Sequence, residues 1–191
     1  MMVPDLLTVE ERQYLLRLAR QSLEQGVRGE GLPRLDLTAL PSRLRELGAS
    51  FVTLTVHGNL RGCIGALEPY QSLAEDVCEH AAAAALEDYR FSPVRPDELA
   101  DINIEISRLT FPQLLKYERP EELPSRLRPG VDGVILRDGI RRATFLPQVW
   151  EKIPDPETFL SNLCWKMGAS SDLWKHKQLE VQIYQVEEFH E

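Results

Sequence analysis

The chain has 191 residues, of which 43% are hydrophobic and 27% charged, and its formal net charge is −8. These values are typical of a globular domain with one core of its own, and they exclude a disordered or fibrous chain. The acidic balance argues against nucleic-acid binding, and the longest apolar run, 81–86, is far too short to span a membrane.

The first part of the chain predicts two helices. Thr8 and Glu11 form a capping-box pattern, and apolar residues then recur at helical spacing until Gly26. A second, shorter helix is expected over 40–49. The first helix is expected to lie at the surface with one apolar side turned inward.

A strand pair is expected over 50–67. Val52, Leu54 and Val56 alternate with polar or aromatic residues, which is the period of a strand with one buried face. The Gly58-Asn59 pair that follows is a turn signal, so the segment is predicted to be a β-hairpin.

Helices and strands continue to alternate in the rest of the chain. Ser72 and Glu75 repeat the capping-box pattern ahead of a long helix that is expected to stop near Phe91, before two prolines. The remaining predicted elements are a strand over 102–110, a hairpin over 130–147 turning at Asp138-Gly139, a helix over 155–168 and a closing strand over 179–189. This order predicts an α+β fold with a mainly antiparallel sheet flanked by helices.

The cysteines indicate a reducing environment. Three of them, at 63, 78 and 164, form an odd and scattered set rather than a disulfide framework. The first residues carry acids where a secretion signal would carry lysines, so a cytoplasmic location is expected. Because paired Cys-x-x-Cys groups, a His-Glu-x-x-His helix and a phosphate-binding loop are all missing from the sequence, neither a metal nor a cofactor is expected.

The stretch LRGCIG, 60–65, is the strongest candidate for chemistry. On a strand, Arg61 and Cys63 lie on the same face, and a nearby cation lowers the pKa of a thiol and so increases its reactive form. Gly62 and Gly65 would let a substrate or another backbone come close. The pattern therefore leaves two interpretations open: a nucleophilic or redox thiol with Arg61 as its electrostatic partner, or a structural cysteine in a tightly packed stretch of backbone.

Two hairpin registers remain open, and they place the thiol differently. A two-residue loop at 58–59 pairs Cys63 with Leu54, on the aliphatic face, where the thiol would be core. A three-residue loop at 58–60 puts Cys63 on the polar face, with His57 nearby as a proton acceptor.

Asp88 and Arg90, in the stretch LEDYRFSP, stand at the end of the long predicted helix. As a charge pair they would stabilise the helix end. Alternatively, a carboxylate beside a guanidinium would line a cleft and orient a substrate. The pattern leaves both interpretations open.

The order of these motifs resembles a known family. LRGCIG, DYRFSP, RATFLPQVW, FLSNLCWKMG and EVQIYQVEEF follow one another over essentially the whole chain. This resembles the AMMECR family, which is named for the Alport-syndrome, elliptocytosis and midface-hypoplasia chromosomal region. Its bacterial and archaeal members are called AmmeMemoRadiSam system protein A.

The resemblance implies one α+β domain over 1–191, made of a larger and a smaller subdomain with the signature near the cleft between them. It implies a Memo-like protein and a radical S-adenosylmethionine protein as partners in a modification pathway acting on a small-molecule or protein substrate. It names no reaction, so the thiol enzyme has a rival, a non-catalytic adaptor that binds these partners. The candidate catalytic residues are Cys63, Arg61 and His57, and the candidate substrate-binding residues are Gly62, Gly65, Asp88, Arg90 and Lys166.

Overall fold

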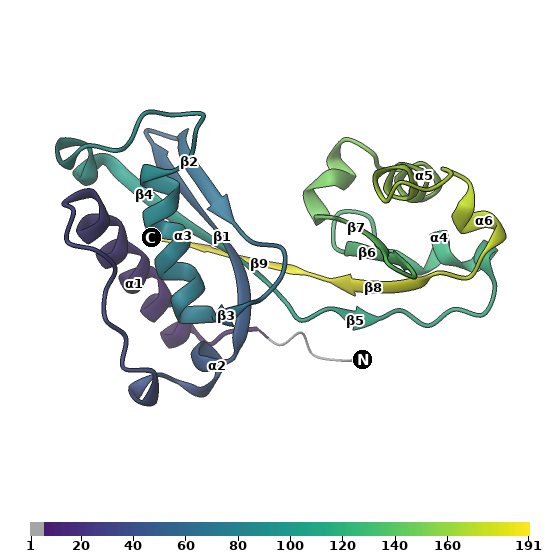
Figure 1. Cartoon of the computed structure of the whole chain (residues 1–191), viewed down its shortest axis with the longest axis horizontal. Coiled ribbons are helices and arrows are strands. Elements are labelled where there is room, and N and C mark those ends of the chain that lie inside the picture. Colours follow the sequence, from purple (N-terminus) through teal and green to yellow (C-terminus); the bar gives the residue numbers. More distant parts are fainter. Residues whose placement is uncertain (1–5) are drawn as a thin grey trace. The chain divides into compact units, whose positions relative to one another are not determined.

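The computed structural model describes residues 6–191, and these residues form two compact units of unequal size. Unit 1 comprises the described residues up to Thr110 together with Glu187–Glu191, and unit 2 comprises Phe111–Val186. Each unit combines helices with an antiparallel sheet (Figure 1), which confirms the predicted α+β class.

Unit 1 is a sheet with helices packed against it. The helices are α1 (Val9–Val27), α2 (Ser42–Arg45) and α3 (Leu73–Leu86), with 3-10 helices η1 (Leu37–Ala39) and η2 (Pro96–Asp101). The strands are β1 (Leu47–Val56), β2 (Asn59–Gly65), β3 (Gln71–Ser72), β4 (Ile102–Leu109) and β9 (Val186–His190). They are arranged in the order β2-β1-β4-β9, and β3 pairs with the start of β1.

Local sequence signals fix both long helices of unit 1. The capping boxes of Thr8 with Glu11 and of Ser72 with Glu75 are present, as predicted. The alanine-rich middle of α3 packs on β1, β2 and α1, because small side chains let a helix approach a sheet closely. Leu23 of α1 is completely buried in this core, and burial of one leucine stabilises the fold by about 1.5–3 kcal/mol.

Two predicted helix boundaries in unit 1 are wrong. The helix expected over 40–49 is reduced to α2, because β1 already begins at Leu47 and pairs there with β3. The long helix ends at Leu86 rather than near Phe91. The residues after Leu86 instead form an irregular segment that runs along the edge of β2, and this segment builds the site described below.

Unit 2 is a smaller sheet covered by one main helix. Its helices are α4 (Leu123–Arg126), α5 (Pro156–Lys166) and α6 (Leu173–His176), with 3-10 helices η3 (Pro120–Glu122) and η4 (Pro147–Glu151). Its strands, in spatial order, are β5 (Gln113–Leu114), β8 (Glu180–Tyr184), β6 (Gly133–Asp138) and β7 (Arg141–Phe145). The hairpin of β6 and β7 turns one residue later than predicted, since Asp138 already pairs with Arg141.

Aromatic stacking organises the core of unit 2. The ring of Phe159 on α5 stacks on Trp150 with centroids 3.6 Å apart and meets Phe145 edge-on at 5.2 Å. The indole N–H of Trp150 donates to the carbonyl of Asp132 at 2.7 Å, so this buried polar group is satisfied. The motifs around 142–150 and 159–168 therefore supply much of this core.

The closing strand predicted over 179–189 is two strands. The first, β8, belongs to the sheet of unit 2, and the second, β9, belongs to the sheet of unit 1. Only Gln185 separates β8 from β9, and the segment contains neither glycine nor proline, so no local turn signal revealed the change of sheet. Among the described helices, none combines the length and apolar character that a membrane span requires.

Candidate functional site

The site is built on the β1–β2 hairpin, and both predicted registers of that hairpin are wrong. His57 and Gly58 form the loop, with positive φ angles of 51° and 79°, and Val56 pairs with Asn59. A β-bulge between Leu54 and Thr55 then shifts the pairing, so that Cys63 lies opposite Thr53.

This register puts the Cys63 thiol on the polar face of the sheet, where it is half-buried. The hydroxyl of Thr53 donates to the Cys63 Sγ at 3.3 Å. The other two cysteines, Cys78 and Cys164, are buried in the two cores. Burial raises the pKa of Cys78 to about 12 and also raises the pKa of Cys164, so both are held as unreactive thiols.

The backbone of Cys63 is held by the segment that follows α3. Cys63 and Thr53 form a non-hydrogen-bonded pair of the antiparallel ladder, so the N–H and carbonyl of Cys63 point away from β1, at the open edge of the sheet. The Asp88 carboxylate accepts the Cys63 N–H at 2.9 Å, and the Arg90 guanidinium donates to the Cys63 carbonyl at 3.3 Å. The two side chains also pair with each other, at 2.6 Å between Arg90 Nη2 and Asp88 Oδ2. They thus occupy the position of a further strand.

Charge and hydrogen bonding stabilise the clamp that Asp88 and Arg90 form on the backbone of Cys63. The Asp88 side chain is only 3% exposed, whereas that of Arg90 is 45% exposed. Hydrogen bonds from Arg90, and then from the Cys63 N–H, hold the pKa of Asp88 well below its usual range. The same carboxylate raises the pKa of Arg90. Asp88 is therefore ionised and firmly held, and the pair has a structural role at the edge of β2 rather than at the end of the helix.

Arg61 is paired with a glutamate rather than with the thiol. Its guanidinium donates to both oxygens of Glu98, at 3.0 and 3.2 Å, and to the carbonyl of Ser92 at 2.9 Å. The hydrogen bond from Arg61 lowers the pKa of Glu98. The predicted role of Arg61 as electrostatic partner of Cys63 is corrected accordingly, because its charge is balanced by Glu98.

The glycines of the signature serve close packing. A Cβ atom at Gly62 would lie 2.0 Å from the carbonyl oxygen of Ala84 on α3. A Cβ atom at Gly65 would lie 2.4 Å from both the Phe51 ring and the Ser50 carbonyl oxygen. The space beside each glycine is therefore filled by the protein itself, so the predicted substrate-binding role of both residues is replaced by tight contact with another part of the chain.

The two remaining predicted site residues are His57 in unit 1 and Lys166 in unit 2. His57 is exposed in the hairpin loop, four positions along β1 from Thr53, which corresponds to about 13 Å. It is therefore too far away to accept the thiol proton. Lys166 belongs to unit 2, where its ammonium donates to the carbonyl of Thr144 at 2.9 Å and lies 5.0 Å from the centre of the Phe145 ring.

Sequence reasoning missed Thr53 and Glu98. Thr53 was placed correctly on the polar side of the alternating strand, but its contact with Cys63 depends on the bulge, which no local signal announces. Glu98 follows Arg95 at capping-box spacing and accepts its N–H at 2.8 Å. The spacing of Arg95 and Glu98 therefore signalled the start of η2, but it did not indicate that Glu98 would pair with Arg61.

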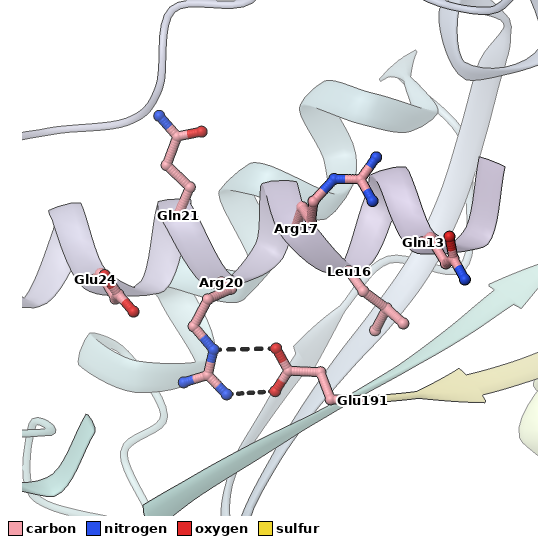
Figure 2. A pocket seen from close by; sticks show the side chains of 7 residues that line it. All are labelled: Gln13, Leu16, Arg17, Arg20, Gln21, Glu24 and Glu191. Atoms are coloured by element: carbon pink, nitrogen blue, oxygen red, sulfur yellow. Dashed lines mark hydrogen bonds and ion pairs between the residues drawn. The ribbon is translucent and has the colours of Figure 1, made fainter. Parts of the chain in front are cut away.

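A separate pocket of about 420 Å³ runs along the outer face of α1 (Figure 2). Its residues are Gln13, Leu16, Arg17, Arg20, Gln21, Glu24 and Glu191. Figure 2 shows Arg20 held in a two-point ion pair by Glu191, and Arg20 also donates to the carbonyls of Leu99 and Ile102. This arginine therefore fastens α1 to the sheet. The pocket lining contains no cysteine, serine or histidine, so Cys63 remains the stronger candidate.

Within residues 6–191, no group of three or more potential ligands is arranged to hold a metal.

Comparison with known proteins agrees with this architecture. A family model, AMMECR1, matches residues 16–189. The chain belongs to the AMMECR1 family. A protein from Methanothermobacter thermautotrophicus is 42% identical over 97% of this chain and 96% of its own length, and one from Thermofilum pendens is 40% identical over 96% and 91%. The crystal structure of an uncharacterised protein from Pyrococcus horikoshii superposes with a TM-score of 0.74 at 34% identity, covering 97% of this chain and 93% of that one. The predicted membership of this AMMECR1 family is confirmed.

Proposed function

We propose that this AMMECR1-family protein is the thiol-bearing component of a modification pathway, with Cys63 as its nucleophile. One observation carries the proposal. Cys63 combines partial exposure, a hydroxyl donor at its sulfur and a backbone fixed on both sides, whereas Cys78 and Cys164 are buried. Among the three cysteines, Cys63 is therefore the one that a substrate can reach, which is the first requirement for a nucleophilic thiol.

Nucleophilic chemistry fits the site better than disulfide chemistry. Cys63 lies on the opposite side of the sheet from α3, which carries Cys78, and Cys164 is buried within unit 2. Both of these cysteines are buried in hydrophobic cores, so neither offers an accessible resolving thiol. In a nucleophilic step the Cys63 thiolate forms a bond to an electrophilic carbon of the substrate, and the leaving group departs with the electron pair of the bond that breaks. We propose a reducing cytoplasm as the setting, with a Memo-like protein and a radical S-adenosylmethionine protein as pathway partners.

The test is site-resolved alkylation of the folded protein by iodoacetamide, read by mass spectrometry. We expect Cys63 to react at least about tenfold faster than Cys78 and Cys164, because burial disfavours the thiolate of the latter two. In denaturant the three rates should become similar, which controls for local sequence. If Cys63 reacts only when the protein unfolds, it is a core residue and the proposal is wrong.

A second function, a non-catalytic adaptor, is favoured by a different observation. The side chains of Arg61, Asp88 and Arg90 are all used in internal contacts, yet Tyr89 between the last two is 95% exposed. A rigidly presented tyrosine is a common anchor at protein interfaces. If the protein is an adaptor, its complex with the Memo-like or radical partner should survive Cys63→Ala and weaken at least about tenfold with Tyr89→Ala, as measured by titration calorimetry. The opposite pattern would reject the adaptor.

A further inference from the structure

A row of three side chains crosses the sheet of unit 1 beside the thiol. Thr53 on β1 is directly opposite Cys63 on β2 and directly opposite Glu105 on β4. Directly paired residues on neighbouring strands point to the same face of a sheet. The contact of Gly62 with α3 shows that the next residue, Cys63, faces away from that helix. Cys63, Thr53 and Glu105 therefore share the face of the sheet opposite to α3.

Glu105 differs from the other carboxylates near the site. Asp88 and Glu98 are each paired with an arginine. Glu105 is half-buried, and within residues 6–191 no hydrogen bond or ion pair engages its carboxylate. Its neighbours on the same face of β4 are Asn103 and Ser107, both uncharged. Glu105 thus supplies a negative charge that its own strand does not balance.

The spacing of the strands puts this charge within range of a molecule at the thiol. Neighbouring strands lie about 4.8 Å apart, so the backbones of Cys63 and Glu105 are separated by about 10 Å. A small molecule bound at the Cys63 sulfur would extend over Thr53 toward Glu105. The arginines at the edge of β2 cannot cancel this field fully, because each is already neutralised by its own carboxylate.

We infer that the Cys63 site selects an electrophile that carries an ammonium or guanidinium group, with Glu105 as the residue that binds this cation. The inference rests on the proposed function, since it requires an accessible thiol. The inference names the class of substrate, which is a cationic compound or a basic side chain. It also gives a role to Glu105, a residue outside the sequence motifs.

The test uses three methanethiosulfonate reagents of one chemistry and different charge: trimethylammonium-ethyl, methyl and sulfonatoethyl. In each reaction the Cys63 thiolate attacks the sulfenyl sulfur, a disulfide forms, and methanesulfinate leaves with the electron pair. Rates at Cys63 are read by mass spectrometry, and the cationic and anionic reagents are each compared with the neutral one. We expect Glu105→Gln to lower the cation-to-anion rate ratio by about 3- to 10-fold, the range for one charge acting over this distance near a protein surface.

Asp101→Asn is the matched control. Asp101 is exposed at the end of η2, and its substitution also removes one negative charge from unit 1. It should leave the ratio within about twofold of the wild type. Glu105→Lys provides a second variant, and it should shift the preference toward the anionic reagent.

The outcomes separate the two proposals. If Cys63 reacts readily but neither Glu105 variant changes the ratio more than Asp101→Asn does, selection of a cation is wrong and the reactive thiol stands. If Cys63 reacts with none of the reagents until the protein is denatured, the proposed function fails, and the inference about Glu105 fails with it.

Discussion

Replacing Gly62 by alanine is expected to unfold unit 1 or to lower its free energy of unfolding by at least about 3 kcal/mol. The added Cβ would lie 2.0 Å from the carbonyl oxygen of Ala84 and 3.0 Å from its carbonyl carbon. These are backbone atoms of α3, which cannot rotate away as the end of a side chain can. The strand and the helix must therefore separate, and this separation would open the alanine-lined contact between α3 and the sheet.

The measurement must report on unit 1. All three tryptophans, Trp150, Trp165 and Trp174, lie in unit 2, so intrinsic tryptophan fluorescence would miss the effect. Amide hydrogen exchange along β1 and β2 follows it directly.

Gly58→Ala is the control for the glycine substitution. This position has a φ of +79° and no atom within 4 Å of the added Cβ, so only the backbone cost of about 1–2 kcal/mol is expected. If Gly62→Ala proves no more destabilising than Gly58→Ala, the close approach of β2 to α3 is not what requires the glycine.

The elements that could be predicted from the sequence are those with local signals. The capping boxes at Thr8 and Ser72 begin helices where expected, and the alternation around Val52 gives a strand with the correct buried face. The start of β1 at Leu47 was missed, because its pairing with β3 joins residues far apart in sequence. Local propensity favoured a helix there, and tertiary pairing overrode it.

The candidate site depended on contacts that pattern alone does not contain. One bulge between Leu54 and Thr55 changed the partner of Cys63, since a shift of one residue reverses the faces of a strand. The partner of Arg61 is Glu98, which stands 37 residues later in the sequence. The two motifs that the sequence singled out separately, LRGCIG and DYRFSP, therefore turn out to hold one another in place.

The second large loss of stability is expected when the clamp of Asp88 and Arg90 on Cys63 is broken. Asp88→Ala is expected to destabilise the protein by about 2–4 kcal/mol at pH 7. Most of this comes from the Cys63 N–H, which loses a charged acceptor worth about 1.5–3 kcal/mol. The ion pair with Arg90 adds little, because the guanidinium is 45% exposed and regains water when the carboxylate is removed.

The pH dependence distinguishes this charged clamp from simple packing. The pKa of Asp88 is lowered in the folded protein, so its stabilisation is complete above the unfolded pKa of about 4 and is lost as the pH falls toward the folded value. The difference in unfolding free energy between wild type and Asp88→Ala should therefore be largest from about pH 5 to 8 and should shrink at pH 3, as measured by denaturant titration with far-UV circular dichroism.

Asp97→Ala offers a matched control for Asp88→Ala. It removes the other aspartate that pairs with an arginine two residues away, but here the side chains are 71% and 69% exposed and the aspartate accepts no hydrogen bond from β2. We expect a much smaller change than for Asp88→Ala and little dependence on pH. A similar cost for both substitutions would mean that the hydrogen bond to Cys63 contributes nothing, and the thiol would then lack the fixed backbone on which its proposed reactivity rests.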